Sequence, residues 1–179
     1  MTSRRSVLIA FGIMLTAFVA THLLPTPGSI HELMSATGGQ AILDLKPSFT
    51  AAEVYQRLSA FGDTGRRVYR QMVWTTDVVF PTAVLAFLLL FARHTIEQLT
   101  PSRPVRTLLL ALPLAYFASD MAENAMIYVL LSDFPLRHEV AGNYLGYVTM
   151  IKRIAQAGAV ILPAGLFFLR DARNLRLIK

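Results

Sequence analysis

The sequence predicts an all-α membrane protein: a bundle of four transmembrane helices with an extramembrane cap between helices 1 and 2. Of its 179 residues, 54% are hydrophobic and 16% are charged. The mean hydropathy is +0.49, which is too apolar for an ordinary soluble domain. Four apolar segments reach the roughly 20 helical residues that a hydrocarbon core requires. Within a single domain of residues 1–179, they cover about residues 7–24, 68–92, 107–131 and 144–169.

The first apolar segment follows two arginines, Arg4 and Arg5, as the apolar core of a signal peptide would. The bulky Phe18, close before Ala20, disfavours cleavage there, because such sites need small residues. We therefore expect an uncleaved first transmembrane helix that ends at Pro25.

Residues 25–67 form the longest connection between apolar segments, and we expect them to build the extramembrane cap. Within the cap, AILDL at residues 41–45 is typical of a short extended stretch. Thr50 followed by Glu53 is a capping-box pattern, which predicts a helix that runs to about Phe61. An apolar face, suited to the bilayer surface or to the end of the bundle, comprises Val54, Leu58 and Phe61.

Each of the other three apolar segments contains one proline: Pro81, Pro113 or Pro163. Proline has no N–H, so the carbonyl four residues earlier loses its helical partner. For Pro81 that carbonyl belongs to Asp77. An acidic side chain and a free backbone acceptor therefore coincide inside a transmembrane helix.

Basic residues predict the orientation, because they concentrate on the cytoplasmic side of a membrane protein. The N-terminus, the 93–106 connection and the tail from residue 170 hold two, three and four Lys or Arg. The opposite side holds six, five of them spread over the long first connection. We expect a multi-pass protein of the cell inner membrane with both termini cytoplasmic.

Charged residues inside three of the segments carry the functional hypothesis. At 1.5 Å per residue, Asp77, Asp120, Glu123 and Lys152 all fall in the outer half of their helices. A charge in lipid costs at least about 2.5–3.5 kcal/mol near the centre, so these groups should face one another or a wet cavity. They are the candidate catalytic residues, as acid and base. The candidate ligand-binding residues are Asn124, Trp74, Tyr116, Tyr128, Thr149, Arg153 and Gln156.

Composition narrows the kinds of site and partner. The chain has no cysteine, which excludes disulfides, thiolate metal sites and thiol catalysis. The net charge is +6, but the basic residues lie mostly at helix ends, so we expect membrane lipids and not nucleic acid as partners. Carboxylate oxygens would suit Mg²⁺, Ca²⁺ or Mn²⁺ if a cation completed the acidic cluster. The sequence assigns neither a metal nor a cofactor.

Three functions fit this pattern. The first is a site for a small or lipid-like ligand, with acid–base chemistry on that ligand. The second is proton- or cation-coupled transport by an oligomer, since four helices are few for a lone transporter. The third is a structural subunit of a membrane assembly, in which the charges set helix register. No nucleophile elbow, HExxH or phosphate-binding glycine loop specifies a reaction.

One residue pattern extends over about residues 43–152. It comprises Leu43-Asp44, Gly65-Arg66 with Tyr69, Asp77 with Phe80-Pro81, Asp120 with Glu123-Asn124, and Thr149 with Lys152. In this pattern the chain resembles a group of small, mostly uncharacterised four-helix bacterial membrane proteins. The resemblance implies the four-helix architecture and carries over no activity.

Overall fold

The computed structural model describes residues 2–176, and this part of the chain contains helices and turns but no strand. Four helical stretches are long and apolar enough to cross a membrane, which confirms the predicted all-α, four-helix class. The elements in chain order are α1 (Arg4–Phe18), the π-helical turn η1 (Val19–Leu23), α2 (Ile30–Ala36), α3 (Ala51–Ala60), α4 (Gly62–Met72), α5 (Thr76–Leu99), α6 (Arg103–Ser132) and α7 (Glu139–Arg176).

The long helices extend beyond the apolar segments that predict them. The first candidate span, Arg4–Leu23, combines α1 and η1, and the second, Gly62–Leu99, combines α4 and α5 across a short break. The other two candidate spans are Arg103–Ser132 and Glu139–Ala172. Hydropathy marks only the apolar part of a helix, whereas backbone hydrogen bonding continues into its polar ends.

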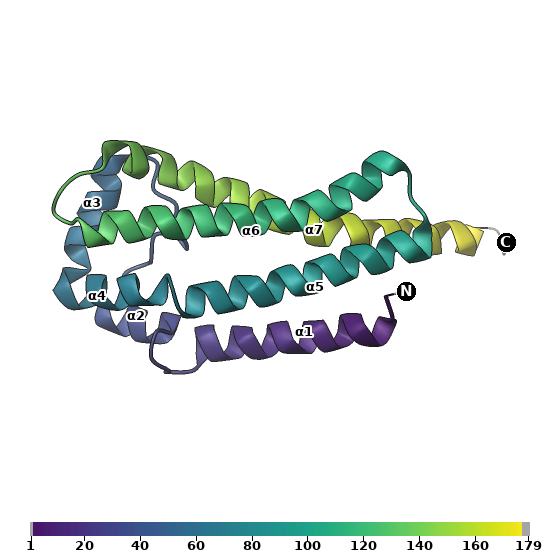
Figure 1. Cartoon of the computed structure of the whole chain (residues 1–179), viewed down its shortest axis with the longest axis horizontal. Coiled ribbons are helices and arrows are strands. Elements are labelled where there is room, and N and C mark those ends of the chain that lie inside the picture. The colour runs from purple at the N-terminus through teal and green to yellow at the C-terminus, as the bar shows by residue number, and fades with distance from the viewer. Residues whose placement is uncertain (1, 177–179) are drawn as a thin grey trace.

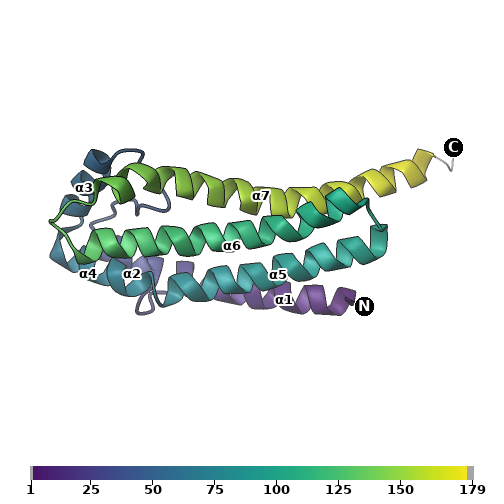
Figure 2. The same ribbon diagram turned by 45° about the horizontal axis from the view of Figure 1, so that its top comes forward.

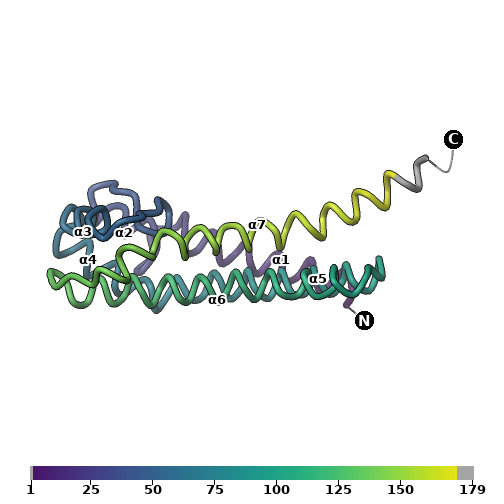
Figure 3. Tube along the Cα trace, turned by 90° about the horizontal axis from the view of Figure 1, so that it is seen from above, coloured from purple at the N-terminus to yellow at the C-terminus, as the bar shows by residue number. Residues whose placement is uncertain are grey.

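The helices are arranged around α5, which lies between α1 on one side and the α6–α7 pair on the other (Figure 1, Figure 2). The short helices α2, α3 and α4 gather at one end of the bundle (Figure 1). The first turn of α1 and the last turns of α7 lie toward the opposite end, as expected for an even number of crossings. Figure 3 shows α7 diverging from α6 toward its C-terminal end.

Two buried apolar clusters follow one another along the bundle. The cap cluster joins residues of the 25–67 segment and α4 to α6 and α7, and it includes Leu33, Leu58, Tyr69, Ile127 and Leu145. The bundle cluster lies between the long helices and consists of Val84, Leu88, Tyr116, Ala155 and Ala159. The 25–67 segment therefore buries its apolar side chains against the long helices and has no separate core.

The helix expected from the capping box is α3, and its start agrees with the prediction. The Thr50 hydroxyl accepts a hydrogen bond from the Glu53 N–H at 3.2 Å, and Glu53 Oε2 accepts one from the Phe49 N–H at 3.0 Å. The first bond satisfies an N–H group that the first turn of a helix leaves free, and the second ties the Glu53 side chain to the backbone before the N-cap. All three residues of the predicted apolar face, Val54, Leu58 and Phe61, are buried in the cap cluster.

The prediction of an extended stretch at residues 41–45 is wrong. The Leu45 N–H donates to the Ile42 carbonyl at 3.1 Å, which closes a turn. The Arg57 guanidinium donates to the carbonyls of Ala41 and Ile42 at 2.5 and 2.7 Å. Arginine donors thus satisfy these carbonyls, so the segment needs no neighbouring strand.

Two glycines of α7 let the cap approach the helix backbone closely. A Cβ atom at Gly142 would lie 2.7 Å from the Ala51 Cα, and one at Gly146 would lie 2.8 Å from Cδ1 of Phe49. Between them, Asn143 Oδ1 accepts a hydrogen bond from the Ala51 N–H at 2.8 Å. The start of α3 is therefore held directly against α7.

We expect Gly146→Ala to lower the free energy of unfolding by about 1–3 kcal/mol, because the added methyl must displace residues 48–49. Gly165→Ala is the matched control in the same helix, since no atom lies within 4 Å of a Cβ there. The control should be neutral or stabilising, because alanine favours a helix over glycine by about 1 kcal/mol. Unfolding in SDS, followed by circular dichroism, measures both. Equal effects of the two variants would contradict close packing at Gly146.

Candidate functional site

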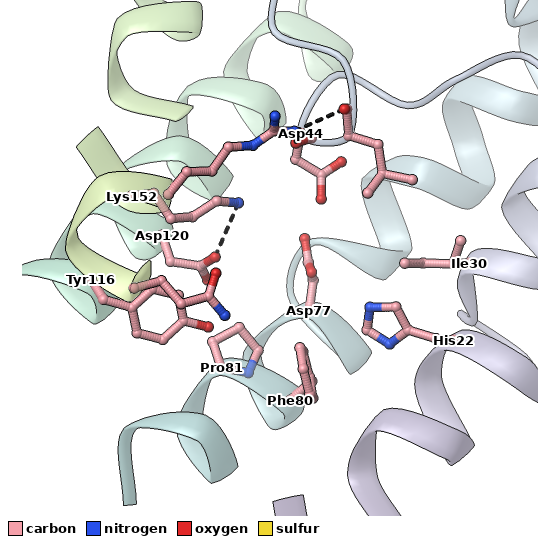
Figure 4. A pocket seen from close by; sticks show the side chains of 12 residues that line it. His22, Ile30, Asp44, Asp77, Phe80, Pro81, Tyr116, Asp120 and Lys152 are labelled. Atoms are coloured by element: carbon pink, nitrogen blue, oxygen red, sulfur yellow. Dashed lines mark hydrogen bonds and ion pairs between the residues drawn. The ribbon is translucent and has the colours of Figure 1, made fainter. Parts of the chain in front are cut away.

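A cavity of about 160 Å³ lies between the cap cluster and the bundle cluster. Residues from η1, α2, α5, α6 and α7 line it, together with the turn at Asp44 and Leu45. Side chains far apart in the sequence therefore converge on one small space. Figure 4 shows Lys152 and Asp120 on one side of the cavity, His22 and Ile30 on the other, Asp44 above and Asp77 below.

A buried ion pair joins α6 to α7 at the cavity. Lys152 Nζ lies 3.2 Å from Asp120 Oδ1 and also pairs with Glu123 Oε2. The side chains of Lys152, Asp120 and Glu123 are 12%, 6% and 0% exposed. The Thr149 hydroxyl, one turn before Lys152, donates to Glu123 Oε1. One ammonium of α7 thus lies between two carboxylates of the adjacent helix α6.

One oxygen of this cluster remains without a partner. Within residues 2–176, no hydrogen-bond donor reaches the buried Asp120 Oδ2. An unsatisfied buried acceptor costs about 1–3 kcal/mol. Asp120 lines the cavity, but this oxygen is covered, so a donor in the cavity would remove the cost once the carboxylate turns toward it.

The backbone carbonyl that Pro81 leaves without a partner receives its hydrogen bond from α6. Asn124 Nδ2 donates to the carbonyl of Asp77 at 3.1 Å. The sequence predicts the free acceptor, and the structure identifies its donor. Asn124 is only 1% exposed and does not line the cavity, so its position joins α5 to α6 behind the cavity wall.

Two further carboxylates face the cavity from opposite directions. Within the described part of the chain, no side-chain hydrogen bond or ion pair reaches the Asp77 carboxylate, which points toward Asp44 in Figure 4. The Asp44 carboxylate accepts a hydrogen bond from the Tyr69 hydroxyl at 3.1 Å. Asp44 is not among the site residues predicted from the sequence. Its position between the apolar Leu43 and Leu45 is the available signal, but only the fold brings it to Asp77.

His22 is a second cavity residue absent from the predicted site. It lies in η1, and π-helical turns are frequent at functional sites. Its ring stacks on Phe18 with centroids 4.6 Å apart and meets Phe80 edge-on at 4.7 Å. Its Nδ1 lies 2.7 Å from the Thr21 hydroxyl. The ring is thus held at the cavity wall by contacts on three sides.

Arg153 lines the cavity, as do the predicted residues Tyr116 and Gln156. The Arg153 guanidinium donates to the backbone carbonyls of Asp44 and Leu45, both at 2.8 Å. Arg153 therefore holds the turn that closes the cavity from the cap side.

The remaining predicted ligand-binding residues lie elsewhere. Trp74 and Tyr128 are 49% and 38% exposed and pack against each other, with ring centroids 5.8 Å apart. Neither lines the cavity. Thr149, Asn124 and the predicted catalytic residue Glu123 are buried behind the wall and do not line the cavity. Thr149 donates to Glu123, which reaches the cavity only through its pair with Lys152. The sequence predicts these residues from their positions near the charged groups along each helix, and position along a helix does not determine which way a side chain points.

The cavity combines an excess of carboxylates with a geometry that does not resemble a metal site. Its lining contains Asp44, Asp77 and Asp120, against the cations Lys152 and Arg153. Among residues 2–176, no group of three His, Asp or Glu side chains is close enough to hold a metal ion. The carboxylates surround the space from different elements and do not converge on one point.

Comparison with known proteins leaves the site to be interpreted from its own geometry. No protein-family model matches the chain, and no curated protein or solved structure matches it. The contacts of the cavity are therefore the basis of the functional inference.

We expect Asn124→Leu to lower the free energy of unfolding by about 1–3 kcal/mol, because the Asp77 carbonyl loses its donor. In a Pro81→Ala background, the N–H regained at position 81 can bond that carbonyl, so Asn124→Leu should cost less there. A double-mutant cycle of SDS unfolding measures the difference. The same cost in both backgrounds would show that Asn124 does not compensate for Pro81.

Proposed function

We propose that the chain crosses the cell inner membrane four times and that the cavity lies in the leaflet nearest the cap. Exposed aromatic side chains support one boundary of the bilayer. Trp74 packs against Tyr128, and Tyr147 packs against both Phe49 and Tyr144, with ring centroids 5.3–6.3 Å apart. Exposed Trp and Tyr concentrate at membrane–water interfaces.

Exposed arginines support the other boundary, one on each of three long helices: Arg93, Arg106 and Arg170. Along α5, α6 and α7, they lie about 29–35 Å from Trp74, Tyr128 and Tyr147, at 1.5 Å per residue. This spacing is close to the roughly 30 Å of a hydrocarbon core. Lys152 and Asp120 would then lie about 8 and 12 Å inside the aromatic boundary.

On this placement, residues 25–67 form an extramembrane cap and both termini are cytoplasmic. The counts of basic residues support this orientation, because the proposed cytoplasmic end holds nine Lys or Arg and the cap end holds six. Lys and Arg concentrate on the cytoplasmic side of a membrane protein. At the cap end, Arg66 also forms an ion pair with Asp63.

We expect a cysteine introduced at Gln56 in α3 to react with a membrane-impermeant maleimide in intact spheroplasts. A cysteine at Ser102, in the connection between α5 and α6, should react only after permeabilisation. Both positions are exposed, and the native chain has no cysteine, so each label reports one site. The reverse pattern would contradict the proposed orientation.

We further propose that the cavity binds the polar head of a lipid-like ligand. The observation that carries this proposal is a cavity of about 160 Å³ faced by two carboxylates, Asp77 and Asp120, with unfilled acceptor positions. That volume is about five times the share of one water molecule, and it is below the roughly 300–1,000 Å³ of a site for a whole drug-sized ligand. A head group fits, while its tail remains in the bilayer.

The same residues supply an acid and a base for chemistry on that head group. The Lys152 ammonium can give a proton to a basic atom of the ligand, and the Asp77 or Asp120 carboxylate can take one from an acidic atom. The low exposure of the pair strengthens its electrostatic interactions, because water screens them less.

Coupled transport and a purely structural network remain the alternatives. The bundle cluster packs between the long helices next to the cavity, which favours a closed site over a passage through the bundle. We therefore place ligand recognition ahead of transport. The unpaired Asp77 carboxylate argues against a purely structural role, since it stabilises no contact in the described part of the chain.

We expect wild-type protein to retain membrane lipid from a total lipid extract in native mass spectrometry. The Asp77→Asn variant should retain at least about tenfold less lipid. Loss of a hydrogen bond to a charged group costs about 1.5–3 kcal/mol, which corresponds to at least about tenfold in affinity. Asp77→Asn should unfold like wild type, because its carboxylate has no protein partner.

Glu97→Gln is the matched control for this experiment. Glu97 lies on the same helix, α5, but at its far end, where it accepts a hydrogen bond from the Thr2 N–H at 2.5 Å. Its lipid retention should equal that of wild type. Unchanged lipid retention in both Asp77→Asn and Asp120→Asn would contradict recognition in the cavity.

A further inference from the structure

We infer that the head group bound in this cavity is a small organic cation, an ammonium group carried on an apolar tail. The inference rests on the proposed function, because it specifies the ligand class of the same cavity. Three features carry it: the balance of charges around the cavity, an unpartnered buried oxygen, and aromatic rings in the wall.

The charge balance favours a cation. The positive charges near the cavity belong to Lys152, which Asp120 and Glu123 share, and to Arg153, which is bonded to backbone carbonyls. The cavity lining therefore holds three carboxyl groups against two cations, and the buried Glu123 behind the wall also draws on Lys152, so at least one negative charge of the lining is uncompensated when its carboxyl groups are ionised. An anionic or neutral head group would leave this excess in place, whereas an ammonium reduces it.

The unpartnered oxygen favours a ligand with N–H donors. Asp120 Oδ2 is buried without a hydrogen-bond donor, and the Asp120 side chain is 6% exposed. The Asp77 carboxylate faces the same space (Figure 4). An ammonium group carries up to three N–H donors and forms charge-assisted hydrogen bonds to carboxylates. The Asp77 carboxylate faces the space for such a group directly, and Asp120 Oδ2 can accept from it once its side chain turns toward the cavity.

The wall next to these carboxylates is aromatic. Phe80 and the buried Tyr116 line the cavity, and His22 lies against Phe80 with ring centroids 4.7 Å apart. Aromatic faces attract ammonium groups, most strongly where water is excluded. Carboxylates combined with aromatic rings therefore suit the charge and also the carbon atoms attached to it.

The geometry favours an organic cation over a metal ion. Asp44, Asp77 and Asp120 approach from the cap turn, α5 and α6, and within residues 2–176 no three acidic or histidine side chains converge as metal ligands. A metal ion needs several oxygens at about 2.0–2.6 Å from one point. An ammonium group on a carbon framework bonds at about 2.7–2.9 Å and can reach separate acceptors.

The test uses four probes with purified protein in a nonionic detergent at neutral pH. Dodecylammonium, dodecanol and dodecanoate share one tail and differ in head charge, while n-butylammonium keeps the cation and lacks a membrane tail. Thermal unfolding and native mass spectrometry measure binding. Dodecylammonium should raise the unfolding temperature. Its affinity should be at least about tenfold higher than that of dodecanol or dodecanoate. If n-butylammonium binds as tightly as dodecylammonium, the result would support a cationic head group but overturn the inference that the ligand carries an apolar tail.

Variants test whether the carboxylates recognise the charge. Asp77→Asn and Asp44→Asn should each weaken dodecylammonium binding about tenfold, because each removes a negative charge from the cavity lining. Asparagine can still accept the Tyr69 hydrogen bond at position 44, so folding should be retained. Glu97→Gln, far from the cavity, should bind dodecylammonium like wild type. Unchanged dodecylammonium binding in both cavity variants would overturn the inference.

The outcomes separate this inference from the proposed function. If dodecanol or dodecanoate binds in the cavity as tightly as dodecylammonium, or more tightly, the inference of a cationic head group would be overturned. Recognition of a lipid-like ligand would still hold. Retention of extracted lipid, with no binding of dodecylammonium, would do the same. If neither extracted lipid nor any probe binds, both the inference and the proposed function fail.

Discussion

The pairing of Lys152 with Asp120 and Glu123 is the interaction on which the arrangement of this site depends. Charges on helices this apolar cannot face lipid without a cost of several kcal/mol, so they must face one another. That requirement sets how α6 and α7 are rotated and aligned along their length. Once Lys152 lies between the two carboxylates, Thr149 reaches Glu123. The buried ion pair therefore specifies helix register as well as the polarity of the cavity.

Residues 25–67, the cap, cover the polar layer that the ion pair aligns. The cap cluster packs on the ends of the long helices, and the Asp44–Leu45 turn, held by Arg153, covers the polar layer. The bundle cluster closes the space on the other side. The cavity thus lies at the junction of two apolar cores, where polar side chains are shielded from the apolar surface of the bundle. Stability of the cap and shape of the cavity are coupled through this junction.

Sequence reasoning recovered part of this site, and its omissions have a physical cause. The spacing of Asp120, Glu123 and Lys152 indicated which groups share a layer, and Pro81 indicated that the Asp77 carbonyl needs a donor. Trp74 and Tyr128 were also predicted to bind the ligand, but their side chains are exposed and pack on each other. Depth along a helix can be counted from the sequence, whereas the rotation of one helix about its axis depends on its neighbours.

The sequence by itself determined the helical class, the four helices apolar enough to cross a membrane and the start of α3, because these follow from local composition, periodicity and capping. It also required that the buried charges meet. Only the tertiary structure decided which groups share the cavity, since Asp44 and His22 come from a turn and a π-helical segment far from Asp77 and Lys152 in the chain. Such contacts are set by how the cap folds back onto the bundle, and the energy of that packing is distributed over side chains that no local pattern brings together.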